Sequence, residues 1–290
     1  MSAINIGSAI YGFQRTQGQA GVGQTQAPEP KTQSAPAAGP EKTAAPRAKA
    51  AIIAAPRVSD AVGKTLLHLQ ETGSVFGDKD AGLMNSRGVT DADRERFAQI
   101  VQDAAETGAY NDPIAYIKSL PAEDVDVLRR VHSLAETRGV IGTDTVEGAV
   151  NLLLPPQNHV DINDDGLVTN GTATGFQFPP PNAPQSVKDA WEEATKHMTA
   201  SEKMLASTPF LSASIGANAK LDADGTVRGF YDHTDPSYRN IFGTSEAEWD
   251  ALLDKMIANL KDSAKSDANR EKQLELLKRF AGSIDNGASA

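Results

Sequence analysis

The chain has 290 residues, 39% hydrophobic and 23% charged, which is enough to bury one or two hydrophobic cores. It contains no cysteine, which excludes disulfide bonds, thiolate metal sites and cysteine nucleophiles. No run of about eighteen apolar residues occurs, so we expect no membrane span.

Charge is unevenly divided along the chain. Residues 1–57 carry six Lys or Arg and two Asp or Glu, whereas the remaining residues carry 22 basic and 36 acidic side chains. The rest of the chain is therefore acidic, and an acidic surface repels phosphate backbones. Nucleic acid is not an expected partner, whereas divalent cations and basic protein surfaces are.

Residues 1–57 are predicted to form a disordered, low-complexity arm. They are rich in Gln, Gly, Ala, Pro and Thr and contain few large apolar residues after Phe13. The first residues lack the basic region of a secretory signal, since Arg15 is the first charge. The uncharged opening is similar to the leaders of type III export substrates, which implies an exported bacterial protein. A plain flexible arm on a cytoplasmic protein is the alternative.

Residues 58–154 are predicted to form an N-terminal helical subdomain, because their apolar residues recur at helical spacing. We expect Gly73 to end the first helix, Thr90 to cap the second and Pro121 to begin a later one. The apolar stretch 146–154 fits a helix or a strand. The residues expected to face the core are Phe97, Ile100, Val101, Ala104, Ala105, Val125, Leu128, Val131 and Ala135.

Residues 161–172 carry the most specific local pattern in the chain. In the numbering of a twelve-residue calcium loop, acidic or amide side chains stand at positions 1, 3 and 5, and a glycine stands at position 6. Calcium prefers six to eight oxygen ligands, and alternate acidic residues folded back at a glycine bring such oxygens to one point. The sequence therefore predicts a bound calcium ion. The predicted ligands are Asp161, Asn163, Asp165, the Leu167 carbonyl, Thr169 and Thr172.

The last position of this loop departs from the pattern. Thr172 stands where a bidentate Glu usually closes the coordination sphere, and its hydroxyl supplies one oxygen at most. We therefore expect a weak site, with a dissociation constant on the order of 10⁻⁴ to 10⁻³ M. A surface turn rich in Asn, Asp and Gly, without metal, is the alternative.

Five residues of this segment carry a family pattern: Asp161, Asn163, Asp165, Gly166 and Val168. In these residues the segment resembles the EF-hand family, and more closely its dockerin-like bacterial variants, which have a hydrophobic residue at position 8. The resemblance covers twelve of 290 residues and implies calcium ligation by the loop. The second loop of dockerins has no good counterpart, because the nearest candidate has Lys220 at position 1. Prolines on both sides predict that residues 155–184 form the loop and an extended connector, with no helix leaving the loop.

Residues 185–290 are predicted to form a C-terminal helical subdomain. Ser186, Thr199 and Ser245 are each followed three residues later by an acidic residue, which predicts three helix N-termini. Asp224-Gly225 between two extended stretches predicts a small β-hairpin near residues 217–231. The predicted fold is thus mainly α, with two helical subdomains joined by a calcium-type loop and a small hairpin in the C-terminal half.

One cluster suggests catalysis. It contains Asp222, Asp224, Asp232, His233 and Asp235, which could serve a metal-dependent hydrolase. Hairpin turns also recruit Asp for backbone reasons, and we favour that interpretation. The chain has no nucleophile elbow, phosphate-binding loop, zinc-protease helix or dinucleotide fingerprint. We therefore favour a protein that is not an enzyme.

The sequence as a whole favours a calcium-binding structural or interaction protein, stabilised by one ion at residues 161–172. It predicts a protein partner without identifying it. Two other hypotheses remain open at this stage. One is the metal-dependent hydrolase, and the other is an adaptor that captures a partner with its basic arm, residues 1–57.

Overall fold

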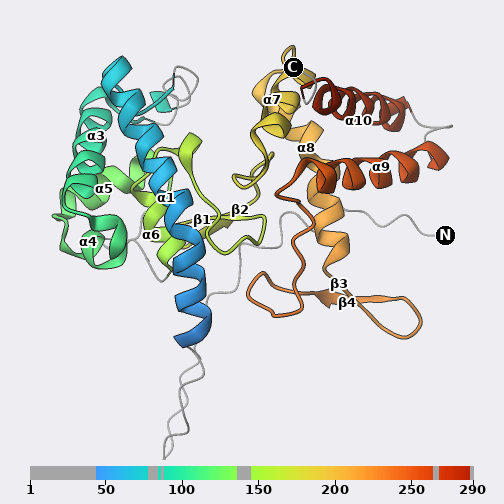
Figure 1. The fold of residues 1–290 in the computed structure, drawn as a ribbon, viewed down its shortest axis with the longest axis horizontal. Coiled ribbons are helices and arrows are strands. Elements are labelled where there is room, and N and C mark those ends of the chain that lie inside the picture. The colour runs from blue at the N-terminus through green and yellow to red at the C-terminus, as the bar shows by residue number, and fades with distance from the viewer. Residues whose placement is uncertain (1–43, 78–83, 86–87, 136–144, 264–267, 288–290) are drawn as a thin grey trace, which may run out of the picture. The chain divides into compact units, whose positions relative to one another are not determined.

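The computed structural model describes residues 44–77, 84–85, 88–135, 145–263 and 268–287. Within these ranges the chain forms nine α-helices and two antiparallel two-stranded hairpins (Figure 1). The prediction of a mainly α fold is confirmed. Residues 1–43 of the predicted arm lie outside the described residues, so the adaptor hypothesis is not addressed by the structure.

The first helix, α1 (Ala44–Thr72), begins earlier than expected. The predicted arm extended to residue 57, but residues 44–57 are helical and Pro56 lies within the helix. The Ala-rich composition, read as low complexity, is also the best helix-forming composition. The helix ends as predicted at Gly73, which has φ +74° and donates its N–H to the Leu69 carbonyl.

The next helices pack around one hydrophobic core. Thr90 and Asp93 form a reciprocal capping box, and Asp112 caps the helix that begins at Pro113. The stretch that fitted a helix or a strand is a helix. The elements are α3 (Asp91–Glu106), η3 (Ala109–Asn111), α4 (Pro113–Ser119), α5 (Ala122–Val131) and α6 (Val146–Leu152). Six of the expected residues are in this core, namely Phe97, Ile100, Val101, Ala104, Leu128 and Val131. Ala105 and Val125 are only half-buried, Ala135 is exposed, and Val127 is buried although it was not expected.

A short 3₁₀ turn and a hairpin follow α6. The turn is η4 (Pro156–Asn158), and the hairpin pairs β1 (Val168–Asn170) with β2 (Ala173–Gly175). The sequence did not predict this hairpin, because its strands are only three residues long and were read as part of the loop and connector. No helix leaves the loop, as predicted, since α7 begins only at Gln185.

The C-terminal helices surround an aromatic core. Its rings include Phe178, Trp191, Phe210, Trp249 and Phe280, and the Phe178 and Phe210 rings stack with centroids 4.0 Å apart. The elements are α7 (Gln185–Ala194), α8 (Ala200–Ala217), β3 (Ala219–Leu221), β4 (Val227–Phe230), α9 (Glu246–Ser263) and α10 (Ala268–Gly287). The predicted hairpin is present as β3 and β4, which follow α8 directly (Figure 1).

One local expectation in this region differs from the structure. Ser186 does not cap α7, whose N-cap is Pro184, and its hydroxyl instead donates to Glu246. The next helix, α8, continues to Ala217 although Pro209 lies inside it. Thr199 does cap α8 through a reciprocal box with Glu202, as predicted.

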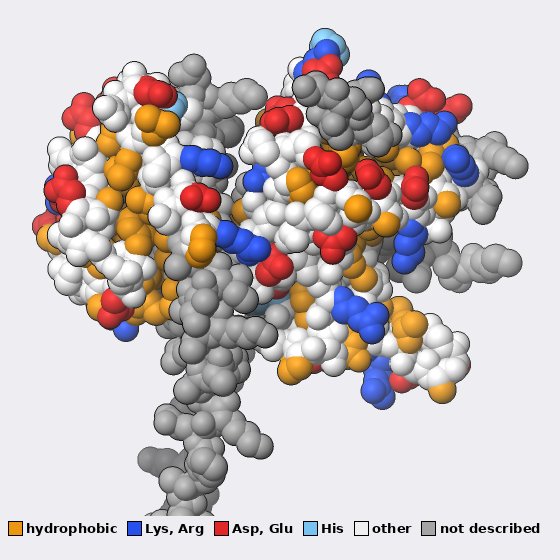
Figure 2. Space-filling view, in the orientation of Figure 1, with side chains coloured by type: hydrophobic (Ala, Val, Ile, Leu, Met, Phe, Trp, Pro, Cys, Tyr) orange, Lys and Arg blue, Asp and Glu red, His pale blue; other side chains and the backbone are white. Residues whose placement is uncertain are grey.

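The two large cores belong to one compact unit, residues 43–290, rather than to separate domains. A third, smaller cluster lies at the loop and joins it to α1 and α6. Its buried members are Val58, Ala61, Val150, Leu154, Val160 and Ile162. Among the described helices, none is both long enough and apolar enough to cross a bilayer. On the face drawn in Figure 2, basic and acidic side chains are interspersed.

Candidate metal-binding loop

Asp161 holds the loop in a folded-back conformation. The residue is fully buried, and both carboxylate oxygens accept backbone N–H groups from the far side of the turn. Oδ1 accepts from Asp165 N at 3.2 Å, and Oδ2 accepts from Gly166 N at 2.8 Å. The side chain at position 1 is therefore pinned to positions 5 and 6, which is the closure that a calcium loop requires.

The side chains at positions 3 and 5 also turn inward. Asn163 Oδ1 accepts the same Asp165 N–H at 3.2 Å, and Asp165 Oδ1 accepts Leu167 N–H at 2.8 Å. Asp164 and Gly166 take left-handed conformations, with φ of 60° and 80°. The chain folds back at these two positive angles, and the Asp161 and Asn163 side chains meet at the Asp165 N–H.

Glycine at position 166 is required by packing as well as by φ. A Cβ added there would lie 2.5 Å from Asn240 Oδ1 and 2.9 Å from Phe242 Cδ2. Both atoms belong to the segment before α9, so the loop and that segment approach as closely as backbone allows.

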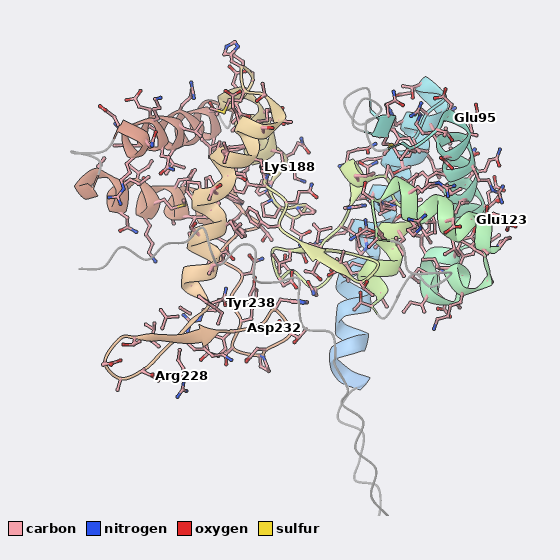
Figure 3. The ribbon with its side chains drawn as sticks, turned by 180° about the vertical axis from the view of Figure 1, so that it is seen from behind. Glu95, Glu123, Lys188, Arg228, Asp232 and Tyr238 are labelled. Atoms are coloured by element: carbon pink, nitrogen blue, oxygen red, sulfur yellow. The ribbon has the colours of Figure 1, made fainter. Side chains whose placement is uncertain are left out.

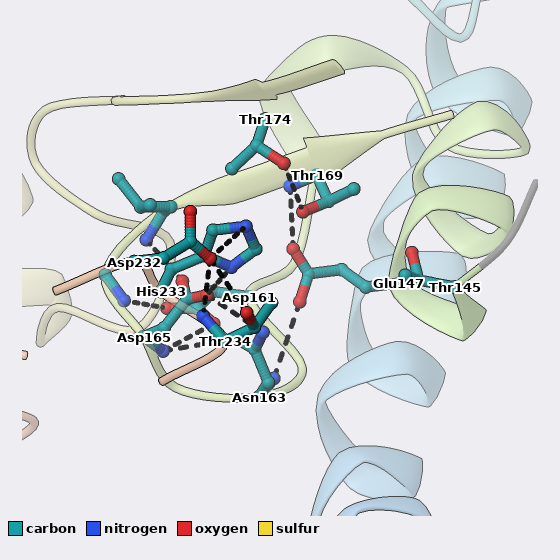
Figure 4. Close-up of polar contacts among 12 residues, drawn as sticks. Thr145, Glu147, Asp161, Asn163, Asp165, Thr169, Thr174, Asp232, His233 and Thr234 are labelled. Atoms are coloured by element: carbon teal, nitrogen blue, oxygen red, sulfur yellow. Dashed lines mark hydrogen bonds and ion pairs between the residues drawn. The ribbon is translucent and has the colours of Figure 1, made fainter. Parts of the chain in front are cut away.

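Two buried polar residues of α6 hold the loop from the other side, and the sequence analysis missed both. Glu147 accepts the N–H of Ile162 at 2.8 Å and, as Figure 4 shows, the N–H of Thr169 at 2.7 Å. Asn151 donates to the carbonyls of Val160 and Thr169, each at 2.8 Å. The sequence did carry a signal for these two residues. Glu147 and Asn151 are four residues apart in an otherwise apolar helix, and polar groups that are buried on such a helix need hydrogen-bond partners.

The loop concentrates negative charge. Burial raises the pKa of Asp161 to about 7, and the neighbouring carboxylates of Glu147, Asp165 and Asp164 add to the effect. Burial also raises the pKa of Glu147, against the backbone N–H groups that lower it. Carboxylates held this close repel one another when all are ionised, and a bound cation removes that repulsion.

The predicted ligands are not equally well placed. Asp161, Asn163 and Asp165 converge, and the Leu167 backbone follows directly from the Asp165 turn. Thr169 lies on β1, where its hydroxyl is 3.1 Å from that of Thr174. Its position is buried, but its hydroxyl already has a partner.

Thr172 is exposed in the turn between β1 and β2, since the chain forms a hairpin here instead of closing the loop. Glu147 is the carboxylate that lies against the loop instead, although it comes from α6 and its oxygens accept loop N–H groups. Within the described ranges, no group of three or more His, Cys, Asp or Glu side chains has the arrangement of a metal site. An ion at this loop would therefore need the Asn163 amide and backbone carbonyl oxygens as ligands, which calcium accepts.

Residues distant in sequence bind the outside of the loop. Asn182 donates to the Asp161 carbonyl at 2.9 Å and to Asp164 Oδ1 at 2.6 Å, and Asn240 donates to the Asp164 carbonyl at 2.9 Å. Arg57 of α1 donates to the Asp161 carbonyl at 3.3 Å. The loop thus contacts α1, α6, the connector before α7 and the segment before α9.

His233 is the residue of the proposed catalytic cluster that reaches this loop. Its Nδ1 is 3.1 Å from Asp165 Oδ2, whereas its Nε2 is 4.0 Å from the exposed Asp232 (Figure 4). Asp232 accepts the Thr234 N–H, which lowers its pKa.

The other three acids of that cluster have separate structural partners. Asp224 accepts the Thr226 N–H, Asp222 pairs with Arg228, and Asp235 pairs with Lys220. These contacts stabilise turns and the hairpin. The geometry gives the hydrolase hypothesis no support.

No known protein family, curated protein or solved structure matches this chain. Function is therefore inferred from the loop and its contacts alone.

Proposed function

We propose that this chain is a calcium-binding structural protein, not an enzyme, in which one ion at residues 161–172 stiffens the junction between the helical cores. The observation that carries the proposal is the pinning of Asp161, whose two carboxylate oxygens bind the backbone of positions 5 and 6. That closure brings together three side chains that carry oxygen atoms, those of Asp161, Asn163 and Asp165.

Electrostatics supports the same function. A buried Asp161 beside three other carboxylates has a raised pKa, which means that its ionised form lacks sufficient positive charge nearby. The nearest basic groups are Arg57, 3.7 Å from Asp164, and His233. A divalent cation among Asp161, Asn163 and Asp165 would supply the missing charge.

The contacts of the loop explain how an ion would stabilise the whole fold. Ile162 packs with Val58 of α1 and Val150 of α6, while Asn240 and His233 bind the loop from the C-terminal part. An ion that binds only the ordered loop stabilises every element that depends on the order of that loop. The proposed role is therefore that of an internal clamp, in a protein that binds another protein through surfaces elsewhere.

The test is the thermal unfolding midpoint of the full chain in chelator, in about 5 mM calcium and in about 5 mM magnesium. With a dissociation constant of about 0.1 to 1 mM, calcium should stabilise by about 1 to 2 kcal/mol and raise the midpoint by about 2 to 8 °C. Magnesium, which demands a smaller octahedral site, should have little effect.

The matched variants are Asp161→Asn with Asp165→Asn, which should abolish the calcium shift, and Asp254→Asn on an exposed site of α9, which should retain it. No calcium shift in the intact chain, or an equal shift in the double variant, would make the loop a metal-free turn. The full chain is used because a truncation at residue 58 would cut α1.

A further inference from the structure

A cavity of about 260 Å³ lies beside the loop and outside the proposed calcium site. Its walls come from α1, from the 3₁₀ turn η4 and the residues after it, from the connector before α7, and from Lys188 of α7, which is labelled in Figure 3. This volume has room for several water molecules or for one small ligand.

The walls of this cavity are basic, although the chain has a net charge of −10. Arg57, Lys64 and Lys188 line it, and Asp60 is the one carboxylate among its lining residues. Asp60 is exposed and forms no ion pair with these three cations. A local excess of positive charge on an acidic protein attracts an anion.

Lys188 is the most informative of the three cations. Its ammonium donates to the Pro181 carbonyl at 2.6 Å, and within the described part of the chain no carboxylate pairs with it. Burial lowers its pKa, and repulsion from Lys64 lowers it further. Two of its three N–H donors therefore have no described acceptor, in a site where an unpaired charge is costly.

Two other polar side chains that line the cavity, Asn158 and Asn182, have hydrogen-bond partners of their own and do not bind these cations. Asn158 donates to the Thr65 hydroxyl at 2.8 Å, and Asn182 donates to the loop. Arg57 donates to the Asp161 carbonyl at 3.3 Å and lies 3.7 Å from Asp164 Oδ1, whereas the two lysines have no carboxylate partner among the described residues. The three cations thus line the cavity from two helices, α1 and α7. A ligand whose acceptor oxygens point in several directions therefore fits this site better than a planar carboxylate does.

We propose that this cavity binds the phosphate group of a small phosphate monoester. Two lysines supply compact positive charges, and Arg57 supplies further N–H donors for phosphate oxygens. The volume left beyond the phosphate accommodates the few atoms that carry it. Inorganic phosphate presents the same charged oxygen acceptors without the attached organic group, so it serves as the smallest probe of the site.

The test is calorimetric titration of the full chain with inorganic phosphate, glycerol 3-phosphate and succinate. The buffer contains low salt and no calcium, so that the result does not depend on the calcium loop and calcium phosphate does not form. We expect both phosphates to bind, with the monoester at least about as tight as the free ion, and succinate to bind about tenfold more weakly or not at all.

Three variants locate the site. Lys64→Gln removes an exposed charge that has no described hydrogen bond, so the fold is preserved, and it should weaken phosphate binding by about tenfold. Lys188→Arg should retain binding because it keeps the charge. Lys118→Gln, at an exposed position of α4, is the matched control and should bind as the intact chain does.

Three results would overturn the proposal. They are the absence of phosphate binding up to about 10 mM, equal binding by Lys64→Gln and Lys118→Gln, and equal binding of succinate and phosphate. None of them bears on the calcium shift of the loop, so the two proposals fail separately.

Discussion

The imidazole of His233 lies against the carboxylate of Asp165, with Nδ1 3.1 Å from Oδ2, although 68 positions separate the two residues. His233 belongs to the segment after β4, and Asp165 is position 5 of the loop. The Asn163 amide nitrogen also donates to this Oδ2, at 2.9 Å. An ion bound by this oxygen must therefore replace at least one of these donors.

His233→Ala is expected to lower the unfolding free energy of the calcium-free protein by about 0.5 to 1.5 kcal/mol, because one hydrogen bond between distant segments is lost. The same change should increase the calcium-induced rise in melting temperature, since the ion no longer competes with the imidazole. Differential scanning calorimetry with and without calcium measures both effects. His197→Ala, at an exposed position, is the control, and a calcium shift that decreases in His233→Ala would contradict the competition.

Glu147→Gln is expected to destabilise the protein by about 1 to 3 kcal/mol. The carboxylate accepts N–H groups from Ile162 and Thr169, and an amide would direct an N–H donor at one of them. Urea unfolding monitored by circular dichroism measures the change. Glu95→Gln, at an exposed position of α3, should stay within about 0.5 kcal/mol of the intact chain, and an equal loss in both variants would rule out the role assigned to Glu147.

The raised pKa of Asp161 predicts that the protein, in the absence of calcium, loses stability as the pH rises. Its pKa is about 7 in the folded protein against 3.8 for the free group, so the folded state binds more protons between these values. The protonated carboxyl contributes to the free energy of unfolding. This contribution is fully present below about pH 3.8 and is lost as the pH rises through about 7.

Asp161→Asn mimics the protonated carboxyl and should remove this dependence. Its free energy of unfolding in chelator should change less between pH 4 and pH 8 than that of the intact chain. The amide also directs an N–H donor at a backbone N–H that the carboxylate accepts, and this cost is the same at both pH values. In calcium at pH 8 the variant should gain no stability, because only the carboxylate binds the ion well. Unfolding free energies at the two pH values measure this, with Asp254→Asn as control. An equal pH dependence in the variant and the intact chain would contradict the prediction.

Two half-buried histidines, each with one buried ring nitrogen, predict the opposite trend in acid. His132 and His159 stack with ring centroids 5.3 Å apart, and burial lowers their pKa values to about 3 and about 4. The unfolded chain binds more protons below the ordinary value of 6.5. The stability of the neutral pair is therefore present above about pH 6.5 and is lost as the pH falls through 4 toward 3.

His132→Phe keeps an aromatic ring beside Phe97 and should flatten the loss of stability between pH 6.5 and 4. Melting temperatures across this range measure the slope for the variant and for His68→Gln, a histidine at the end of α1 that is not fully buried. If the slope stayed unchanged in His132→Phe and became flatter in His68→Gln, the acid sensitivity would not arise from the His132–His159 pair.

The helices could be predicted from the sequence because their signals are local. The caps at Thr90, Asp112 and Thr199 and the stop at Gly73 each depend on contacts within a few residues. The start of α1 could not be predicted in the same way. Its first turns are rich in Ala and contain Pro, and this composition occurs in disordered segments as well as in helices.

The candidate site was predicted only in its local part. Asp161, Asn163 and Asp165 converge within one turn, so their spacing in the sequence is informative. Glu147, Asn151, Asn182 and His233 reach the loop through tertiary packing, which spacing does not reveal. Thr172 was assigned by counting along an EF-hand pattern, whereas the chain turns into a hairpin before that position.

Arg57 belongs to two sites at once. Its guanidinium donates to the carbonyl of Asp161 and also lines the basic cavity. If an anion in the cavity moves this side chain, the environment of the loop changes with it. Thermodynamics then requires reciprocity: whatever factor a phosphate compound imposes on calcium affinity, calcium must impose on the affinity for that compound.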